Sequence, residues 1–110
     1  MSDVNQVLLV GRLGQNPVLR QTKNQLPVAE LSVATSHGFG DKETTTWHKV
    51  SVWGKQAEAC NRFLAKGSQV LVQGRIKHSK YETADGQARI STEINADQVT
   101  FLGKPKMAVA

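Results

Sequence analysis

Cysteine is nearly absent from this sequence, since Cys60 is the one thiol among 110 residues. A single cysteine excludes both an internal disulfide framework and a cluster of cysteine metal ligands. Long apolar runs are also missing, and stretches such as Val7 to Val10 are far shorter than a membrane span. The first residues do not combine a basic segment with an apolar core, so no signal peptide is predicted. We therefore expect a cytoplasmic protein.

Acidic side chains are in the minority. The chain has 14 lysines and arginines against 9 aspartates and glutamates, which gives a formal net charge of +5 and a pI near 9.7. This excess favours a polyanionic partner, nucleic acid before membrane, although lysines scattered over a solvated face give the same count. A chain of 110 residues suffices for one domain and leaves no room for a second core.

A recognisable catalytic or metal-binding pattern is lacking as well. The acidic residues are scattered singly, and His37 and His78 do not have the spacing of a metal site. The segment Gly11 to Gly14 lacks the further glycine and the Gly-Lys-Ser/Thr ending of a phosphate loop. We therefore predict no enzyme activity, no cofactor and no metal, and we interpret His48 as a structural histidine.

Alternating apolar residues predict strands for most of the chain, and one segment has helical spacing. Asp85-Gly86 is a strong hairpin signal, and Gly67 is expected to follow the C-terminus of the helix. On the strand after the helix, Val70, Val72 and Ile76 are expected to point inward. The predicted elements are strands over 4–13, 18–22 (short), 27–37, 44–53, 69–79 and 89–102, a helix over 55–66 and a hairpin loop over 82–88.

Five main strands with a helix between the third and the fourth are the order of an all-β OB-fold, a five-stranded, partly open Greek-key barrel. We assign this domain to residues 1–103 and expect 104–110 to form a short flexible tail. The first strand is apolar on both of its faces. Because a small core covers only one face, we expect the other to contact a second subunit, with Val7 and Leu9 at that contact.

The strand over residues 44–53 has two unlike faces. Successive side chains of a strand point to opposite sides, so His48, Val50 and Val52 share one face. Trp47, Lys49, Ser51 and Trp53 share the other. Two tryptophans six positions apart lie about 20 Å apart at ~3.3 Å per residue, far enough to stack on separate bases of one extended strand. Packing in a core or an interface is the competing interpretation of this pair.

Further cations and aromatic residues surround this strand. Phe39 stands in a glycine-flanked loop, where it could instead cover the core, and Tyr81 ends the strand after the helix. Aromatic rings beside cations are typical of proteins that bind single-stranded nucleic acid independently of its sequence. The candidate phosphate-binding residues are Arg12, Lys49, Lys55, Lys66, Arg75, Lys77 and Lys80.

Several segments are similar to bacterial single-stranded DNA-binding proteins. They are 4–17 (Val-Asn-Gln-Val-Leu-Leu-Val-Gly-Arg-Leu-Gly-Gln-Asn-Pro), 28–35, 46–50, 53–58 and 66–70. The resemblance extends from about Val4 to Leu102 and implies an OB-fold that assembles as a homotetramer and binds single-stranded DNA. It also implies base stacking by Phe39, Trp47, Trp53 and Tyr81, and a place for His48 near a subunit contact.

The resemblance further implies a nucleoid-associated protein that acts in DNA replication, recombination and repair. Family members usually continue into a flexible linker and an acidic tip that recruits partner enzymes. This sequence ends in Lys104-Pro105-Lys106-Met107 and three small or apolar residues, so partner recruitment does not follow from it. Two alternatives stay open: an accessory primosome-type module that also binds proteins or RNA, and a small nuclease.

Overall fold

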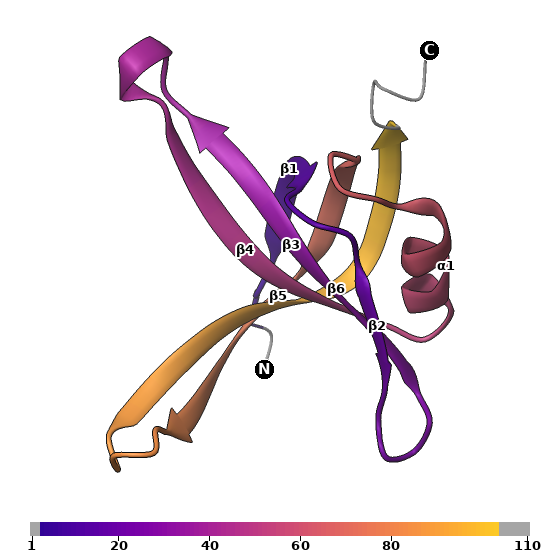
Figure 1. Cartoon of the computed structure of the whole chain (residues 1–110), viewed down its shortest axis with the longest axis vertical. Coiled ribbons are helices and arrows are strands. Elements are labelled where there is room, and N and C mark those ends of the chain that lie inside the picture. The colour runs from indigo at the N-terminus through magenta and orange to yellow at the C-terminus, as the bar shows by residue number, and fades with distance from the viewer. Residues whose placement is uncertain (1–2, 104–110) are drawn as a thin grey trace.

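The computed structural model describes residues 3–103, which form one six-stranded sheet, one α-helix and one short 3-10 helix (Figure 1). The elements are β1 (Val7–Leu13), β2 (Val18–Gln21), β3 (Pro27–His37), η1 (Gly40–Lys42), β4 (Thr44–Trp53), α1 (Lys55–Phe63), β5 (Gln69–Glu82) and β6 (Ala88–Gly103). The sheet order is β1-β5-β6-β4-β3-β2, and β1 also pairs with β3, so that the sheet closes on itself. The predicted OB-fold is confirmed, with β2 as a short additional strand that pairs with β3.

The core lies inside this barrel and is built from alternate residues of its strands. Val50 and Val52 of β4 are fully buried, as are Val70 and Val72 of β5. β-branched residues favour this arrangement because they pack well on a pleated surface. Helix α1 adds Ala57 and Cys60 to the same cluster and packs chiefly against β3. The remaining members are Leu13, Ala29, Leu31, Val33, Leu64 and Ile94.

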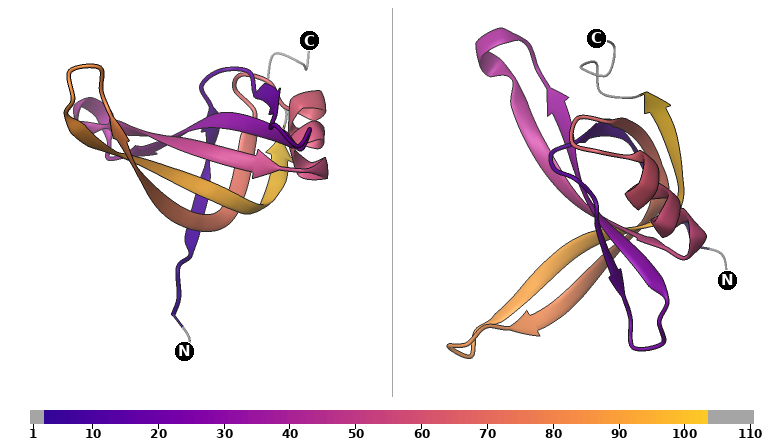
Figure 2. Two further views of the ribbon diagram at one scale, coloured as in Figure 1. Left: turned by 90° about the horizontal axis from the view of Figure 1, so that it is seen from below. Right: turned by 45° about the vertical axis from the view of Figure 1, so that its right-hand side comes forward.

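Two hairpins extend beyond the barrel as two-stranded ribbons. Strands β3 and β4 form one ribbon and β5 and β6 form the other, and both project to the side opposite α1 and diverge (Figures 1 and 2). The radius of gyration is 15.5 Å, whereas a compact chain of this length is expected to have about 13 Å. The ribbons therefore give a small domain an unusually extended surface.

A bulge in β6 marks the place where the second ribbon leaves the barrel. Gln73 pairs with Gln98 but Gly74 pairs with Ala96, which leaves Asp97 as an extra residue without a partner. The side chain of Gln56 on α1 bonds to the bulge residue and to the strand after it, donating to the Asp97 carbonyl at 3.0 Å and accepting from the Val99 N–H at 2.8 Å. The bulge reverses the alternation along β6, an interruption that the sequence pattern does not indicate.

Three local predictions were wrong. The first strand begins at Val7 rather than at residue 4. The helix ends at Phe63 rather than near residue 66, and Gly67 lies in the following turn with a φ of 92° instead of directly after the helix. Ile76 was expected inside but is 40% exposed, because the ribbon beyond the bulge has no second layer to pack against. The hairpin loop was predicted correctly, since β5 ends at Glu82 and β6 begins at Ala88.

Among residues 3–103, no helix is both long enough and apolar enough to cross a membrane. The tail predicted for residues 104–110 lies outside the described residues.

Candidate nucleic-acid interface

The outward face of β4 carries the two tryptophans. Trp47 is 62% exposed and Trp53 is 43% exposed, while Val50 and Val52 on the opposite face are fully buried. Lys49 lies between the two rings on the outward face and is exposed as well. The predicted division of β4 into two faces is therefore confirmed by burial. Large apolar rings on an outward strand face are available for another molecule to cover.

Trp47 is held in place by the turn after β1. A Cβ atom added to Gly14 would clash with Cζ3 and Cη2 of the Trp47 ring, so this ring lies directly against the glycine backbone. A hollow of about 340 Å³ opens beside the ring. Its lining residues are Gln15, Glu30, Leu31, Ser32, Trp47, His48 and Lys49. Because Trp47 stays largely exposed beside this contact, a base could still stack on its ring.

The sheet register extends this face across three strands. Arg12 of β1 pairs with Ala34 of β3, and Ala34 pairs with Trp47 of β4. Residues that pair directly point to the same side of a sheet, so the exposed Arg12 lies on the face of Trp47 with a small alanine between them. The structure thus brings a predicted cation of β1 beside a predicted stacking residue.

The same face continues into the β5–β6 ribbon. The hydroxyl of Ser51, next to Lys49 on the outward side of β4, donates to Glu93 Oε2 at 3.4 Å. Ser51 is buried although it points outward, because β6 lies beside it in the sheet and the Glu93 side chain of β6 contacts it. Lys77 pairs with Glu93 across the ribbon, which places Lys77 on this continuous face.

The remaining two predicted stacking residues lie toward the ends of the two ribbons. Phe39 is 92% exposed and directly precedes η1 in the loop between β3 and β4. Tyr81 is half exposed on β5 and pairs with Arg89 of β6. The ribbons diverge from the barrel (Figure 1), so the four aromatic side chains are spread along an extended path rather than gathered in one cleft.

Arg89 was not predicted as a site residue. It is exposed and lies directly opposite Tyr81, where its guanidinium can meet a phosphate next to a stacked base. Counting outward from the Asp85-Gly86 turn would have indicated this pairing, because the hairpin fixes the register of the two strands.

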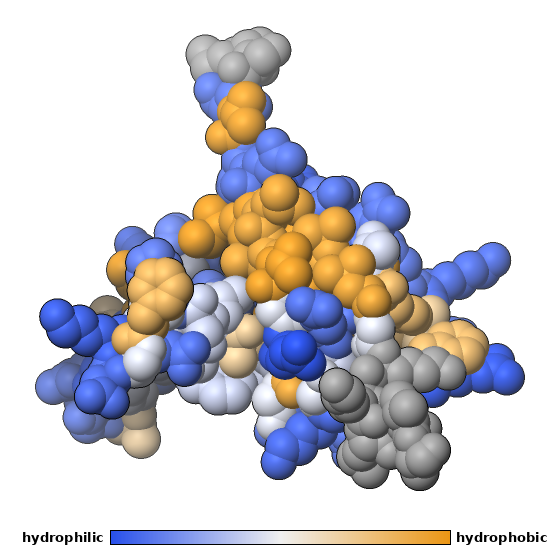
Figure 3. All heavy atoms as spheres, turned by 90° about the horizontal axis from the view of Figure 1, so that it is seen from above, coloured by the Kyte–Doolittle hydropathy of each residue, from blue (hydrophilic) through white to orange (hydrophobic). Residues whose placement is uncertain are grey.

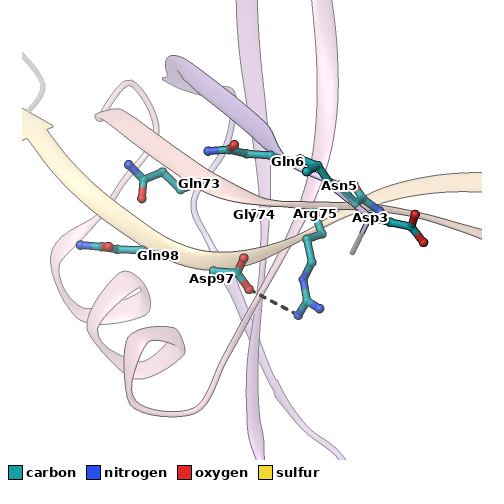
Figure 4. A pocket seen from close by; sticks show the side chains of 9 residues that line it. Asp3, Asn5, Gln6, Gln73, Gly74, Arg75, Asp97 and Gln98 are labelled. Carbon is teal, nitrogen blue, oxygen red and sulfur yellow. Dashed lines mark hydrogen bonds and ion pairs between the residues drawn. The ribbon is translucent and has the colours of Figure 1, made fainter. Parts of the chain in front are cut away.

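The predicted phosphate-binding residues do not all lie beside the tryptophans. Arg75 lies at the base of the second ribbon, and its guanidinium forms an ion pair with Asp97 at 3.4 Å (Figure 4). The two side chains meet at the edge of a polar hollow of about 420 Å³. Its lining residues are Asp3, Val4, Asn5, Gln6, Gln73, Gly74, Arg75, Asp97 and Gln98. The positive charge of Arg75 is therefore partly offset by Asp97 in the free protein.

Three further lysines of the predicted set lie at different places around the barrel and the second ribbon. Lys66 follows α1, and its backbone N–H donates to Asn16 in the turn that also carries Gly14, so it lies near the edge of the Trp47 hollow. Lys55 begins α1 two residues after Trp53, close to the end of β4. Lys80 pairs with Ile90 and points to the opposite side of the ribbon from Lys77. Their contact with phosphate stays a prediction.

His48 lies on the inward side of β4, as its position in the strand predicts. Its Nε2 is 2.9 Å from the Thr35 hydroxyl, and the side chain is half-buried. This hydrogen bond satisfies one ring nitrogen and fits a structural histidine. Within residues 3–103, no three histidine, cysteine, aspartate or glutamate side chains come close enough together to hold a metal ion.

The first strand exposes a different face from the one expected at a subunit contact. Val7 and Leu9 pack against the core, whereas Leu8 and Val10 are more than half exposed. Figure 3 shows apolar side chains gathered on the molecule's surface beside the N-terminal segment. The role predicted for Val7 and Leu9 stays a prediction, and the apolar face that a neighbour could cover is that of Leu8 and Val10.

The chain resembles known proteins both in a family comparison and in a comparison with single proteins. The model of the single-strand binding protein family matches residues 4–102. A protein of Xylella fastidiosa (strain Temecula1 / ATCC 700964) with the name single-stranded DNA-binding protein is 39% identical over 105 residues. The alignment covers 91% of this chain and 64% of that relative, so the chain spans less than two thirds of the relative's length.

Proposed function

Because the chain belongs to the single-strand binding protein family, we propose that it binds and protects single-stranded DNA without regard to base sequence. The observation that carries the proposal is the outward face shared by Trp47, Lys49 and Arg12, which combines an exposed ring with two cations. This face continues through Lys77 toward Tyr81 and Arg89 on the second ribbon. We propose that the DNA follows it.

Binding combines two kinds of contact. Stacking on an aromatic ring contributes about 1–3 kcal/mol per base and accepts any base, because every base has a π-face. Lysine and arginine neutralise phosphates and release counterions, which makes the affinity fall as salt rises. Trp47, Trp53, Phe39 and Tyr81 would supply the stacking, and the cations of the same face would supply the phosphate contacts. Binding of this kind requires no catalytic group.

We further propose that the protein acts as a homotetramer in DNA replication, recombination and repair. The exposed face of Leu8 and Val10 supports self-association, because apolar side chains on a strand at a free sheet face are stabilised when a second subunit covers them. A cytoplasmic, nucleoid-associated location is also part of this proposal.

Tryptophan fluorescence titrated with oligothymidylate tests the proposed function directly. Trp47 and Trp53 are the only tryptophans, so the signal reports on the proposed face alone. We expect quenching that persists when duplex DNA is added in excess and that requires more oligothymidylate at the higher of two salt concentrations. An unchanged signal, or full reversal by duplex DNA, would contradict the proposal. Repeating the titration with oligouridylate would separate DNA binding from an accessory module that also binds RNA.

A further inference from the structure

We propose that Gln56 and Asn5 are positioning residues for DNA binding, because their side-chain amides fix the direction in which the second ribbon leaves the barrel. The inference rests on the proposed function, in which this ribbon, formed by β5 and β6, brings Lys77, Tyr81 and Arg89 to the DNA. The two amides act through the ribbon and not through contact with the DNA.

Gln56 takes the place of a strand neighbour on the β6 side of the ribbon. Strand β4 pairs in parallel with β6 as far as Asn95, and after Trp53 the chain turns into α1. The Gln56 side chain then donates to the Asp97 carbonyl at 3.0 Å and accepts from the Val99 N–H at 2.8 Å. These are the two groups that a residue of a parallel neighbouring strand would bond. One side chain therefore continues the ladder across the bulge.

Asn5 has the same role on the β5 side. Strand β1 begins at Val7, which pairs with Gly74 of β5, so Asn5 lies in register with Ile76. Its side chain donates to the Ile76 carbonyl and accepts from the Ile76 N–H, both at 3.0 Å. Two residues that form a hydrogen-bonded antiparallel pair exchange the same two bonds. The Asn5 amide therefore extends the ladder of β1 by one step onto the ribbon.

Both amides act at the place where the ribbon could pivot. Asn5, Gly74 and Asp97 border one polar hollow there (Figure 4). The bulge leaves Asp97 outside the ladder between β5 and β6, and a bulge lets a strand bend. The ion pair of Arg75 with Asp97 is more than half exposed on both sides, so it holds this place only weakly. The four amide bonds to α1 and to the N-terminal segment are the firmer restraint.

The length of the ribbon turns a small rotation at the bulge into a large displacement at its far end. Tyr81 lies seven positions after Gly74, which is about 23 Å along a strand at ~3.3 Å per residue. A rotation of roughly 10° would move Tyr81 by about 4 Å, similar to the ~3.4 Å between nucleotides of one strand. A ribbon that is already held in one direction also costs less to order when DNA binds.

A role in folding alone makes a different prediction. If the amides only stabilise the barrel, their removal weakens DNA binding equally whether or not the ribbon carries a stacking ring. If they position the ribbon, most of the loss disappears once the Tyr81 ring has been removed, since residues that act together are not additive. Removal of the Trp47 ring, which lies outside the second ribbon, should leave the loss unchanged.

A thermodynamic cycle tests the proposal. The affinity of the full chain for labelled oligothymidylate is measured by anisotropy for Gln56→Ala and Asn5→Ala, each alone and combined with Tyr81→Ala or Trp47→Ala. We expect each amide variant alone to bind about five- to tenfold more weakly. This loss should fall to about twofold or less in the Tyr81→Ala background and stay full in the Trp47→Ala background. Asn61→Ala, which removes an exposed amide from the same helix, should leave the affinity unchanged.

The possible outcomes are distinct. Losses of equal size in both backgrounds would overturn the proposal, and so would unchanged affinity in both single variants. Light scattering should give every variant the mass of the unmodified protein, and a lower mass would assign the loss to assembly and count against the proposal. If Gln56→Ala no longer unfolds cooperatively in urea, Asn5→Ala, which changes an exposed residue, decides by the same cycle. The DNA-binding proposal fails separately, when the unmodified protein does not bind oligothymidylate.

Discussion

The inward and outward faces of β4 both carry large apolar side chains, but only the inward ones are buried. On the inward face Val50 and Val52 are fully buried, because they pack in the core that the closed sheet surrounds. On the outward face Trp47 and Trp53 remain exposed although each is larger and contributes more apolar area than a valine. Burial in this domain therefore follows the direction of the side chain in the strand. A substitution should affect folding on one face and ligand binding on the other.

The largest effect is expected from Val50→Asp on the inward face. An unpaired carboxylate in the core costs several kcal/mol, which is comparable with the whole stability of a small domain. We expect the cooperative urea transition, followed by far-UV circular dichroism, to disappear at neutral pH. A variant that still unfolds cooperatively with a midpoint near that of the unmodified protein would contradict the division of β4 into a folding face and a binding face.

The outward face should give the reverse result. Trp47→Ala and Trp53→Ala should each weaken the binding of oligothymidylate by about 1–3 kcal/mol, because each removes one stacking surface. The urea midpoint should change little, and less for Trp47 than for Trp53, which is the more buried of the two. Binding is measured by anisotropy of labelled oligothymidylate, since these variants lose part of the intrinsic fluorescence. Loss of the unfolding transition in either variant would mean that the tryptophan belongs to the core.

A smaller effect is expected from Gly14→Ala, which changes the position of an outward ring without removing it. The added methyl group has to displace the Trp47 ring from the turn after β1. We expect a loss of affinity for oligothymidylate smaller than that of Trp47→Ala, and an altered fluorescence maximum in the free protein. In the Trp47→Ala background the same substitution should have almost no further effect on binding, since residues in direct contact are not additive.

Cations on the outward face should affect the salt dependence more than the affinity at a single salt concentration. Lys49→Ala and Lys77→Ala should each reduce the slope of log K against log salt by about 0.7, the value for one phosphate contact on a single strand. Lys23→Ala, on the turn after β2, serves as the matched control and should leave the slope unchanged. A slope that is unchanged in Lys49→Ala would remove this residue from the path of the DNA.

The smallest effect is expected from the ionisation of Cys60, which is buried on the inward side of α1. Burial raises the pKa of the Cys60 thiol to about 11, because the thiolate loses its hydration in the apolar core. The unfolded chain ionises near the usual value of 9.0. The neutral thiol therefore makes its full contribution to the free energy of unfolding below pH 9, and this contribution is lost as the pH rises toward 11. The urea midpoint should fall more steeply above pH 9 than in Cys60→Ala, and a thiol reagent should label Cys60 only after unfolding.

Strict alternation explains why the sequence predicted β4 and the barrel half of β5 correctly. Alternation gives the wrong orientation where a bulge inserts an extra residue, and where a strand leaves the barrel and has no second layer to pack against. Asp97 adds one residue to β6 and reverses its alternation, and no local residue pattern distinguishes it from its neighbours. Ile76 has the spacing of a core residue, but the layer it would pack on is missing because the ribbon has left the barrel. Arg89 was not predicted because the role proposed for it depends on its cross-strand partner Tyr81.

The ribbon formed by β5 and β6 has a consequence for how stability is distributed along a single strand. Amides near Val70 and Val72 belong to the closed barrel and should exchange their hydrogens only when the whole domain unfolds. Beyond the bulge, toward Tyr81, the strand has only one neighbour and solvent on both sides, and an isolated two-stranded hairpin is marginally stable in water. Protection against exchange should therefore decline steeply along β5, so that the ribbon can open and reclose on its own while the barrel stays folded.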